Sequence, residues 1–224
     1  MSTVFVMLDL AVAGPIVAVL AIGDIVLHLY YDIGKIRRRT GFATEETSFS
    51  GPGLVLFLAG LATLCSFWMV AMIIFSWAAS AAMETLPLLS VLWSAPDPQW
   101  GAGLVILSAG IVLHGWSRAV RRDMASSWDL GKGHEIVTRG PYAWIRHPSY
   151  VSYTLGFIGL FLMWPSIIGL FLLLGIPGYY SISLTEEENL LSHFGDEYRQ
   201  YVARTGRFVP RLRRTSNSTP PPEP

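Results

Sequence analysis

Two stretches of this sequence concentrate ionisable and aromatic side chains that could bind a charged ligand. The first, residues 134–150, holds Arg146 and His147 beside two tyrosines, and the second, residues 185–198, holds three consecutive glutamates. Between them, residues 150–185 contain no Asp, Glu, Lys or Arg. A carboxylate that is aimed inward needs a cation or a hydroxyl as its partner, because an unpaired buried charge is strongly unfavourable. The two stretches together therefore predict a site for a ligand with ionic groups.

Periodicity separates the three glutamates from one another. A helix over residues 185–204 would carry one inward-facing stripe formed by Glu187, Leu191, Phe194, Tyr198 and Tyr201. On the same helix, Glu186 and Glu188 would lie on the two flanks of the stripe. Thr185 and Glu188 also fit the T-x-x-E capping box, which gives Glu188 a structural role if the helix begins there. Glu187 is therefore the carboxylate that we expect to face inward.

Long apolar runs must position these two stretches. The chain is 52% hydrophobic and only 14% charged, whereas a soluble domain carries about 25% charged residues. Runs suited to helical membrane spans occupy residues 4–27, 51–83, 100–117, 150–164 and 166–185. We expect an all-α polytopic membrane bundle of about five transmembrane helices, with a tight hairpin between the last two and a cytosolic C-terminal amphipathic helix. One long kinked helix over the last two runs is the alternative.

The basic residues predict the topology. All 16 Lys and Arg residues follow the first, third or fifth apolar run. Since basic loops stay on the cytosolic side, the N-terminus is expected outside and the C-terminus in the cytosol. A bacterial inner membrane is favoured over the endoplasmic reticulum. Because the short hairpin returns its two ends to the same side, it should bring His134, Tyr142, Arg146 and His147 close to the carboxylates of residues 186–188.

Other features of the sequence argue against several kinds of site. The formal net charge is zero, which argues against a nucleic-acid partner. No C-x-x-C or H-E-x-x-H spacing is present, so no metal is expected. The single cysteine, Cys65, is interpreted as a packing residue, and His28 and His114 as packing or interfacial residues. Asp9 and Asp24, both in the first apolar run, have no assigned role.

An ordered set of motifs covers about the last third of the chain. It consists of HEIVTRGPYAWIRHPSY at 134–150, EE at 186–187, HFGDEYRQY at 193–201 and Pro210. The set resembles the isoprenylcysteine carboxyl methyltransferase family of integral-membrane methyltransferases. The resemblance implies S-adenosylmethionine at the cytosolic membrane edge. The cofactor-binding residues carried over by match are His134, Ile136, Val137, Tyr142, His147, Pro148, Ser149, Tyr150 and Glu186 or Glu187.

The resemblance also gives these side chains a chemistry. Arg146 and His147 are the candidate catalytic residues, because either could pair with the carboxylate of the cofactor. His147 or His134 could serve as the base for a thiol or amine acceptor. Aromatic faces of Tyr142 and Tyr150 can stabilise a sulfonium cation. The acceptor would be a lipophilic small molecule that enters sideways from the membrane lipid.

The chain departs from this family at the expected acceptor site. Members that methylate prenylcysteine carry an Arg one turn before the EE pair, whereas residues 180–184 contain no basic residue. The expected acceptor is thus a prenylcysteine carboxylate or, better suited to an uncharged site, a thiol, amine or small lipid. Tyr179 and Tyr180, beside a kink at Pro177–Gly178, are expected to line its site. The expected division of the chain has three parts. Residues 1–120 form three transmembrane helices, residues 121–210 form the cofactor-binding loop, the hairpin and the C-terminal helix, and residues 211–224 form a disordered tail.

Two other functions remain open at this point. The NADPH-dependent sterol reductases share a similar R-H-x-x-Y and acidic pattern, but they are much larger, with about twice the number of spans. A non-catalytic membrane homologue that kept the fold and lost the chemistry is the other alternative, which the missing Arg favours and the intact 134–150 stretch opposes.

Overall fold

The computed structural model of the chain describes residues 2–38, 53–80, 90–122 and 135–211. Within these ranges the regular structure is helical, apart from two isolated β-bridges. The helices in chain order are α1 (Ser2–Arg38), α2 (Gly53–Ala78), α3 (Asp97–Arg121), η3 (Gly140–Ala143), α4 (Pro148–Met163), α5 (Ile167–Leu172), η4 (Leu173–Gly175), α6 (Ile176–Phe194) and α7 (Asp196–Arg204). The expected all-α bundle is confirmed.

Four helical segments are long and apolar enough to cross a membrane. They are Leu10–Ile33 within α1, all of α2, all of α3, and the continuous run Ile167–Phe194 that α5, η4 and α6 form together. The fifth apolar helix, α4, is shorter, with 16 residues. Large apolar side chains point outward from these helices, such as Val19 at 72% exposure and Leu64 at 66%, as a lipid-facing surface requires. The chain is a multi-pass membrane protein.

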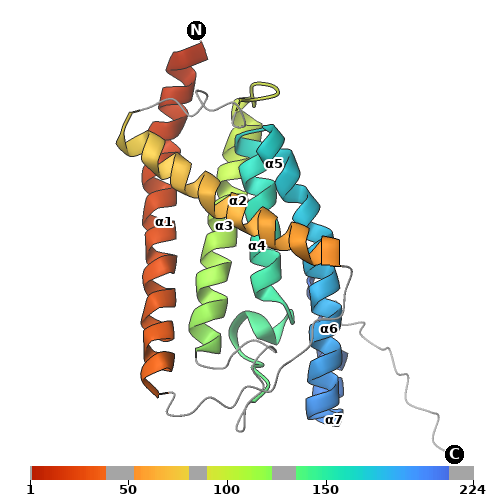
Figure 1. Cartoon of the computed structure of the whole chain (residues 1–224). Helices are drawn as coiled ribbons and strands as arrows, with labels where there is room; N and C mark the ends of the chain where they lie inside the picture. The colour runs from red at the N-terminus through yellow and green to blue at the C-terminus, as the bar shows by residue number, and fades with distance from the viewer. Residues whose placement is uncertain (1, 39–52, 81–89, 123–134, 212–224) are drawn as a thin grey trace, which may run out of the picture.

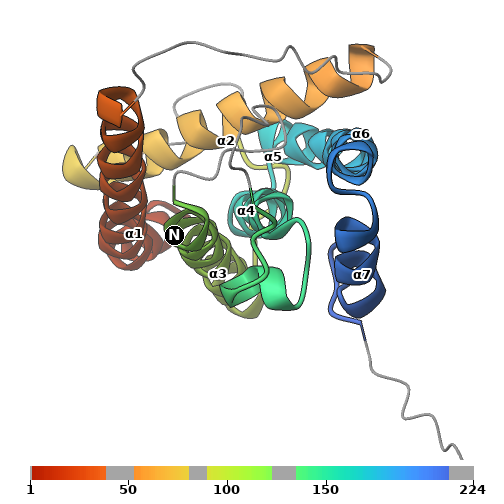
Figure 2. The same ribbon diagram turned by 90° about the horizontal axis from the view of Figure 1, so that it is seen from below.

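The arrangement gathers the polar segments at one end of the bundle. α1, α3 and α4 stand side by side, and α2 crosses them obliquely (Figure 1). Seen from below, α2 runs along one side of the bundle from α1 to α6, both of which it contacts (Figure 2). The end of α3, the start of α4 and the end of α6 all lie at the lower end of Figure 1. We call this end, with residues 135–150 and 186–211, the polar end.

The connection between α4 and α5 is the tight turn that the sequence predicts. α4 ends at Met163, and the Oγ atom of Ser166 accepts a hydrogen bond from Gly169 N at 3.1 Å, which caps α5. The alternative of one long kinked helix is wrong. A turn of 3₁₀ helix at η4 precedes Pro177, which stands in the first turn of α6, where its missing N–H leaves no hydrogen bond unmade.

Two glycines allow neighbouring helices to touch. A Cβ atom on Gly159 would lie 2.6 Å from the backbone nitrogen of Leu107, so α3 and α4 meet almost backbone to backbone. A Cβ atom on Gly178 would lie 2.4 Å from the Cβ of Ala59 in α2. On that face, the space expected beside Pro177–Gly178 is filled by α2.

The expected single helix over residues 185–204 is broken in two. α6 ends at Phe194, and Gly195 takes a φ of +53° before α7 begins, a conformation that glycine adopts without steric cost. α6 itself begins at Ile176, so the helix start and capping box predicted at Thr185 are wrong. The last membrane helix therefore continues past its expected end and carries the glutamates with it. The expected disordered tail falls almost wholly on residues 212–224, outside the described residues.

Candidate functional site

A backbone pairing fastens the loop before α4 to the segment after α7. Arg146 N donates to the carbonyl of Gly206 at 2.9 Å, and His147 N donates to the carbonyl of Arg207 at 3.2 Å. Gly206 N in turn donates to the carbonyl of Trp144 at 3.0 Å, completing an isolated parallel bridge. This pairing holds Arg146 and His147 opposite the end of α6.

Glu187 is the centre of the polar end. Its Oε1 atom accepts hydrogen bonds from Arg146 Nε at 2.8 Å and Arg207 Nε at 3.0 Å, and its Oε2 atom accepts one from Arg207 Nη2 at 2.7 Å. His147 Nε2 lies 3.1 Å from the same Oε1 atom. The side chain is only 13% exposed. Its predicted inward orientation and its predicted partners Arg146 and His147 are confirmed.

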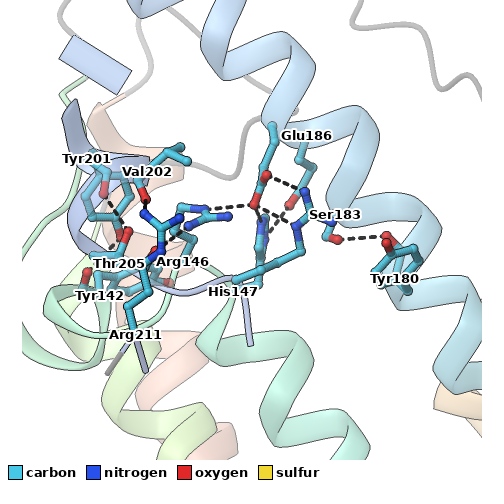
Figure 3. Close-up of polar contacts among 12 residues, drawn as sticks. Tyr142, Arg146, His147, Tyr180, Ser183, Glu186, Tyr201, Val202, Thr205 and Arg211 are labelled. Carbon is cyan, nitrogen blue, oxygen red and sulfur yellow. Dashed lines mark hydrogen bonds and ion pairs between the residues drawn. The ribbon is translucent and has the colours of Figure 1, made fainter. Parts of the chain in front are cut away.

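Glu186, predicted on a flank of the inward stripe, is buried as well. The residue is 8% exposed, and its Oε2 atom lies 3.3 Å from His147 Nδ1. His147 therefore stands between two carboxylates, one at each ring nitrogen. Figure 3 shows His147 beside Glu186 of α6. Glu188 points outward and is exposed. Glu186 and Glu187 lie on adjacent faces of α6. Both faces are covered, because the segments 144–147 and 205–208 pack against them.

The two carboxylates set the charge of His147. Burial by itself lowers the pKa of the imidazole, but the contacts with Glu186 and Glu187 outweigh it and raise the pKa above the ordinary value of 6.5. A protonated ring donates from both nitrogens, which matches a carboxylate at each of them. The imidazolium form is the one that this geometry stabilises.

His147 should make the stability of the protein fall as the pH rises. Because its pKa is higher in the folded state than the ordinary 6.5, its stabilising contribution is fully present below pH 6.5 and is lost as the pH rises through the folded-state value. We expect the melting temperature of wild type in detergent to fall as the pH rises above 6.5. That of His147→Gln should fall less over the same range. Thermal unfolding scans from pH 6 to pH 9 measure this. Parallel curves for the two proteins would contradict it.

Aromatic rings continue inward from His147. Tyr150 stacks on the His147 ring with centroids 5.4 Å apart, and lies 5.0 Å from the ring of Tyr179. Tyr179 is 8% exposed, whereas Tyr180 is 52% exposed. Of the two tyrosines predicted to line the acceptor site, Tyr179 thus belongs to the interior. Tyr180 instead lies under the Arg207 guanidinium, 5.6 Å from its ring centroid.

Tyr142 and the tyrosines of α7 connect the loop before α4 to α7. The Tyr142 carbonyl, in η3, accepts a hydrogen bond from the Tyr201 hydroxyl at 2.7 Å. Tyr198 is 2% exposed, and its hydroxyl has no hydrogen-bond partner among the described residues. Tyr142 is buried too. The predicted cofactor residue Tyr142 therefore has a structural contact through its backbone. Tyr198, predicted to face inward but not selected as a site residue, brings a buried hydroxyl.

The remaining predicted residues lie in the same loop and in the first turn of α4. Pro148 is the first residue of α4 and is buried. The Ser149 hydroxyl lies 3.0 Å from a serine hydroxyl of α3. Ile136 and Val137 are half-buried in the irregular segment before η3. His134 lies outside the described residues.

Arg207 is the residue of this site that sequence reasoning did not select. It comes from the segment after α7, donates two hydrogen bonds to Glu187, and places its guanidinium over Tyr180. Arg146 is fixed from the same segment, since its Nη1 atom donates to the carbonyl of Thr205 at 2.7 Å. In the sequence, Arg207 is one of six basic residues after the last span, and only the chain reversal after α7 distinguishes it from the others.

Known proteins resemble this chain in two different ways. Residues 99–197 match the family described as phospholipid methyltransferase. The methanethiol S-methyltransferase of Mycobacterium tuberculosis is 25% identical over 220 residues, which covers 90% of this chain and 82% of that protein. This similarity extends along nearly the whole chain.

Other relatives match only about a third of the chain. The nickel-cobalt-cadmium resistance protein NccN of Alcaligenes xylosoxydans xylosoxydans is 40% identical over 82 residues, 36% of this chain and 38% of that protein. The human protein-S-isoprenylcysteine O-methyltransferase is 39% identical over 79 residues, 34% of this chain and 28% of that protein. The chain thus spans well under half the length of these two relatives.

Proposed function

Because this chain belongs to the isoprenylcysteine carboxyl methyltransferase family, we propose that it transfers a methyl group from S-adenosylmethionine to a small lipophilic acceptor. The observation that carries the proposal is the convergence of Arg146, His147 and Arg207 on Glu186 and Glu187 at the polar end of the membrane helices. Membership in a family of methyltransferases argues against the NADPH-dependent reductase alternative.

The polar end has the groups that S-adenosylmethionine needs. Its amino-acid part carries a carboxylate, which suits Arg146 or Arg207, and an ammonium, which suits Glu186 or Glu187. With His147 protonated, three cations share two carboxylates there, so a further anion would be favourable. The buried Tyr198 hydroxyl without a partner is available for one more hydrogen bond. These residues fit the cofactor.

The remaining predicted cofactor residues complete the proposed site. Bound S-adenosylmethionine supplies an electrophilic methyl group on a sulfonium. Tyr150 and Tyr179 offer ring faces that stabilise a cation, and Tyr142, Pro148 and Ser149 are proposed to border the cofactor from the loop and the first turn of α4. His134, Ile136 and Val137, carried over from the family resemblance, are proposed to border it as well. Positioning and exclusion of water by these residues supply most of the rate, because methyl transfer depends mainly on in-line alignment.

The acceptor that best suits this site is a neutral thiol. The methanethiol S-methyltransferase aligns along 82% of its own length, whereas the isoprenylcysteine methyltransferases of human and Schizosaccharomyces pombe align over about a third of theirs or less. Arg207 does bring a cation beside Tyr180, but both its Nε and Nη2 atoms are bound to Glu187. If Arg207 also holds the carboxylate of the cofactor, its charge is shared between that group and Glu187, which leaves less of it for a prenylcysteine carboxylate.

The topology completes the proposal. We place the polar end in the cytosol, where the water-soluble donor enters, and the N-terminus outside, because all the basic residues follow the first, third and fifth spans. A bacterial inner membrane suits this orientation. Residues 1–120 would form three transmembrane helices, and residues 121–210 the cofactor-binding loop, the helical hairpin and the C-terminal helix.

Incubation of the purified protein in lipid nanodiscs with methyl-labelled S-adenosylmethionine and membrane or thiol extracts tests the function. A labelled thioether is the expected product. Crosslinking to labelled NADPH, with none to labelled S-adenosylmethionine, would restore the reductase reading. Cofactor binding without transfer to any extract would identify a non-catalytic homologue.

A further inference from the structure

A second polar cluster lies inside the bundle, away from the ionic groups of the polar end. Asp24 and His28 come from α1, His114 comes from α3, and Tyr153 comes from α4. The side chains of Asp24 and His114 are each 15% exposed, and that of His28 is 28% exposed. Ionisable residues within membrane helices are rare and mark functional sites, so this cluster needs an explanation beyond packing.

The hydrogen bonds of this cluster form a directed chain. His114 Nδ1 lies 3.0 Å from Asp24 Oδ2, and His114 Nε2 lies 3.1 Å from the Tyr153 hydroxyl. A carboxylate can only accept, so Nδ1 carries the proton and donates to Asp24. In the neutral ring Nε2 is then the acceptor, and the Tyr153 hydroxyl donates to it. Asp24, His114 and Tyr153 thus have the order of an acid, an oriented base and a hydroxyl.

The geometry does not suit a metal ion, although Asp24, His28 and His114 could offer ligand atoms within 4.8 Å of one another. The rings of His28 and His114 are stacked at 4.8 Å with planes only 14° apart, so their in-plane lone pairs run side by side instead of converging. His28 Nδ1 also lies 2.9 Å from the backbone carbonyl of Asp24, to which it can only donate. A hydrogen-bonded relay accounts for these contacts better.

The hydroxyl end of the relay meets the proposed acceptor site. The Tyr153 ring stacks on that of Tyr179, with centroids 5.1 Å apart and planes 20° apart. Tyr150, one turn earlier on α4, also contacts the Tyr179 ring and stacks on the His147 ring. Tyr153 therefore lies on the membrane side of the aromatic residues that lead inward from the cofactor groups, where a lipophilic acceptor would arrive.

We propose that Tyr153 accepts the proton of a neutral thiol during methyl transfer, and that His114, oriented by Asp24, takes over the proton of Tyr153. This inference rests on the proposed function. The thiol S–H bond breaks, and the sulfur uses a lone pair to form the new S–CH₃ bond. The bond between the methyl and the donor sulfur breaks, with its electron pair left on that sulfur. The thiol proton goes to the Tyr153 oxygen as the Tyr153 proton moves to His114 Nε2.

Charge is conserved by this step within the low-dielectric bundle. The positive charge of the sulfonium disappears as the imidazolium of His114 forms, so no net charge is created. Asp24 stabilises that imidazolium through Nδ1, and its other oxygen, Oδ1, is buried without a hydrogen-bond partner among the described residues. A Cβ atom on Gly115 would lie 3.1 Å from this oxygen. The Asp24 carboxylate is thus held close to His114, and its Oδ1 atom can accept a further hydrogen bond.

The test compares an alkyl thiol, which is protonated at neutral pH, with 4-nitrothiophenol, which is already a thiolate. Only the first needs a base, because the thiolate is the nucleophile. We expect His114→Gln and Tyr153→Phe to lower kcat/KM for ethanethiol about 100-fold, and to leave that for 4-nitrothiophenol close to wild type. His28→Phe keeps a ring stacked on His114 and removes its nitrogens. This variant should leave kcat/KM for both thiols close to that of wild type.

Two readouts besides activity complete the experiment. ¹⁵N-histidine NMR in nanodiscs should show His114 with a protonated Nδ1 and an unprotonated Nε2. The His114 signals are identified by their loss in His114→Gln. The chemical shift of Nε2 should change in Tyr153→Phe. Calorimetry should give the same affinity for S-adenosylhomocysteine in all the variants, since Tyr153→Phe keeps the ring that stacks on Tyr179 and no relay residue is bound to the described ionic groups of the polar end.

Each contrary outcome has its own meaning. Equal losses for the two thiols in His114→Gln would refute the relay and leave the proposed function standing. Loss of activity in His28→Phe, together with a stoichiometric transition metal in the wild-type protein, would also refute the relay. That result would identify a metal site. Transfer by wild type to neither thiol, with S-adenosylhomocysteine unbound, would refute the proposed function and this inference with it.

Discussion

Glu187→Gln should lower the affinity for S-adenosylhomocysteine about a thousandfold. Glu187 is the shared partner of Arg146, His147 and Arg207. In the complex, the ammonium of the proposed ligand would lose its carboxylate partner. Truncating one partner of a buried charge pair costs about 2–5 kcal/mol of binding free energy, and about 4 kcal/mol corresponds to a factor of about 10³. The Gln amide would also turn a donor toward guanidinium groups that have only donors. Isothermal calorimetry on protein in nanodiscs measures the affinity.

Glu188→Gln is the matched control for this prediction. Glu188 is the next residue of α6, carries the same charge, and is exposed, so its replacement should leave the affinity within about threefold, as expected of a surface change. Equal affinities for wild type and Glu187→Gln would remove Glu187 from the cofactor site. Thermal unfolding of both variants separates loss of the binding groups from loss of the fold.

Arg207→Ala should raise the KM for S-adenosylmethionine about 100-fold. Arg207 donates to both oxygens of Glu187 and covers the ring of Tyr180. Hydrogen bonds to charged groups contribute about 1.5–3 kcal/mol each, and their loss releases the 205–208 segment that holds Arg146 and His147 in place. Arg207→Lys should lie between wild type and Arg207→Ala, because a lysine cannot reproduce the planar two-pronged contact. Steady-state kinetics with labelled donor measure the change.

Arg199→Ala provides the comparison for Arg207. Arg199 lies on α7, close by in the sequence, but its side chain is 65% exposed and pairs with an Asp three residues earlier. Such exposed pairs contribute little, so its loss should leave the KM unchanged. A wild-type KM in Arg207→Ala would show that the segment after α7 only covers the site.

The apolar spans and the inward Glu187 could be predicted because each depends on local pattern. A charge-free run of membrane length must become a helix in lipid, whatever its neighbours are. The break at Gly195 divides the predicted stripe between α6 and α7, and Leu191 is exposed, yet Glu187 faces inward and Tyr198 and Tyr201 are buried. The burial of Glu186 was not predicted, because stripe analysis assumes one buried face. At the end of α6, the 144–147 and 205–208 segments bury an adjacent face too, and no periodicity in α6 itself records that.

By itself, the sequence determined that this is a multi-pass membrane protein with complementary charges at the two ends of one hydrophobic hairpin. Composition and periodicity are properties of consecutive residues, and they suffice for that. The tertiary structure decided the partners of those charges. Arg207 reaches Glu187 only because the helix breaks at Gly195 and the segment after α7 pairs with the loop before α4. Asp24, His114 and Tyr153 meet across 90 and 39 residues of sequence, a distance over which only the packing of α1, α3 and α4 fixes which side chains touch.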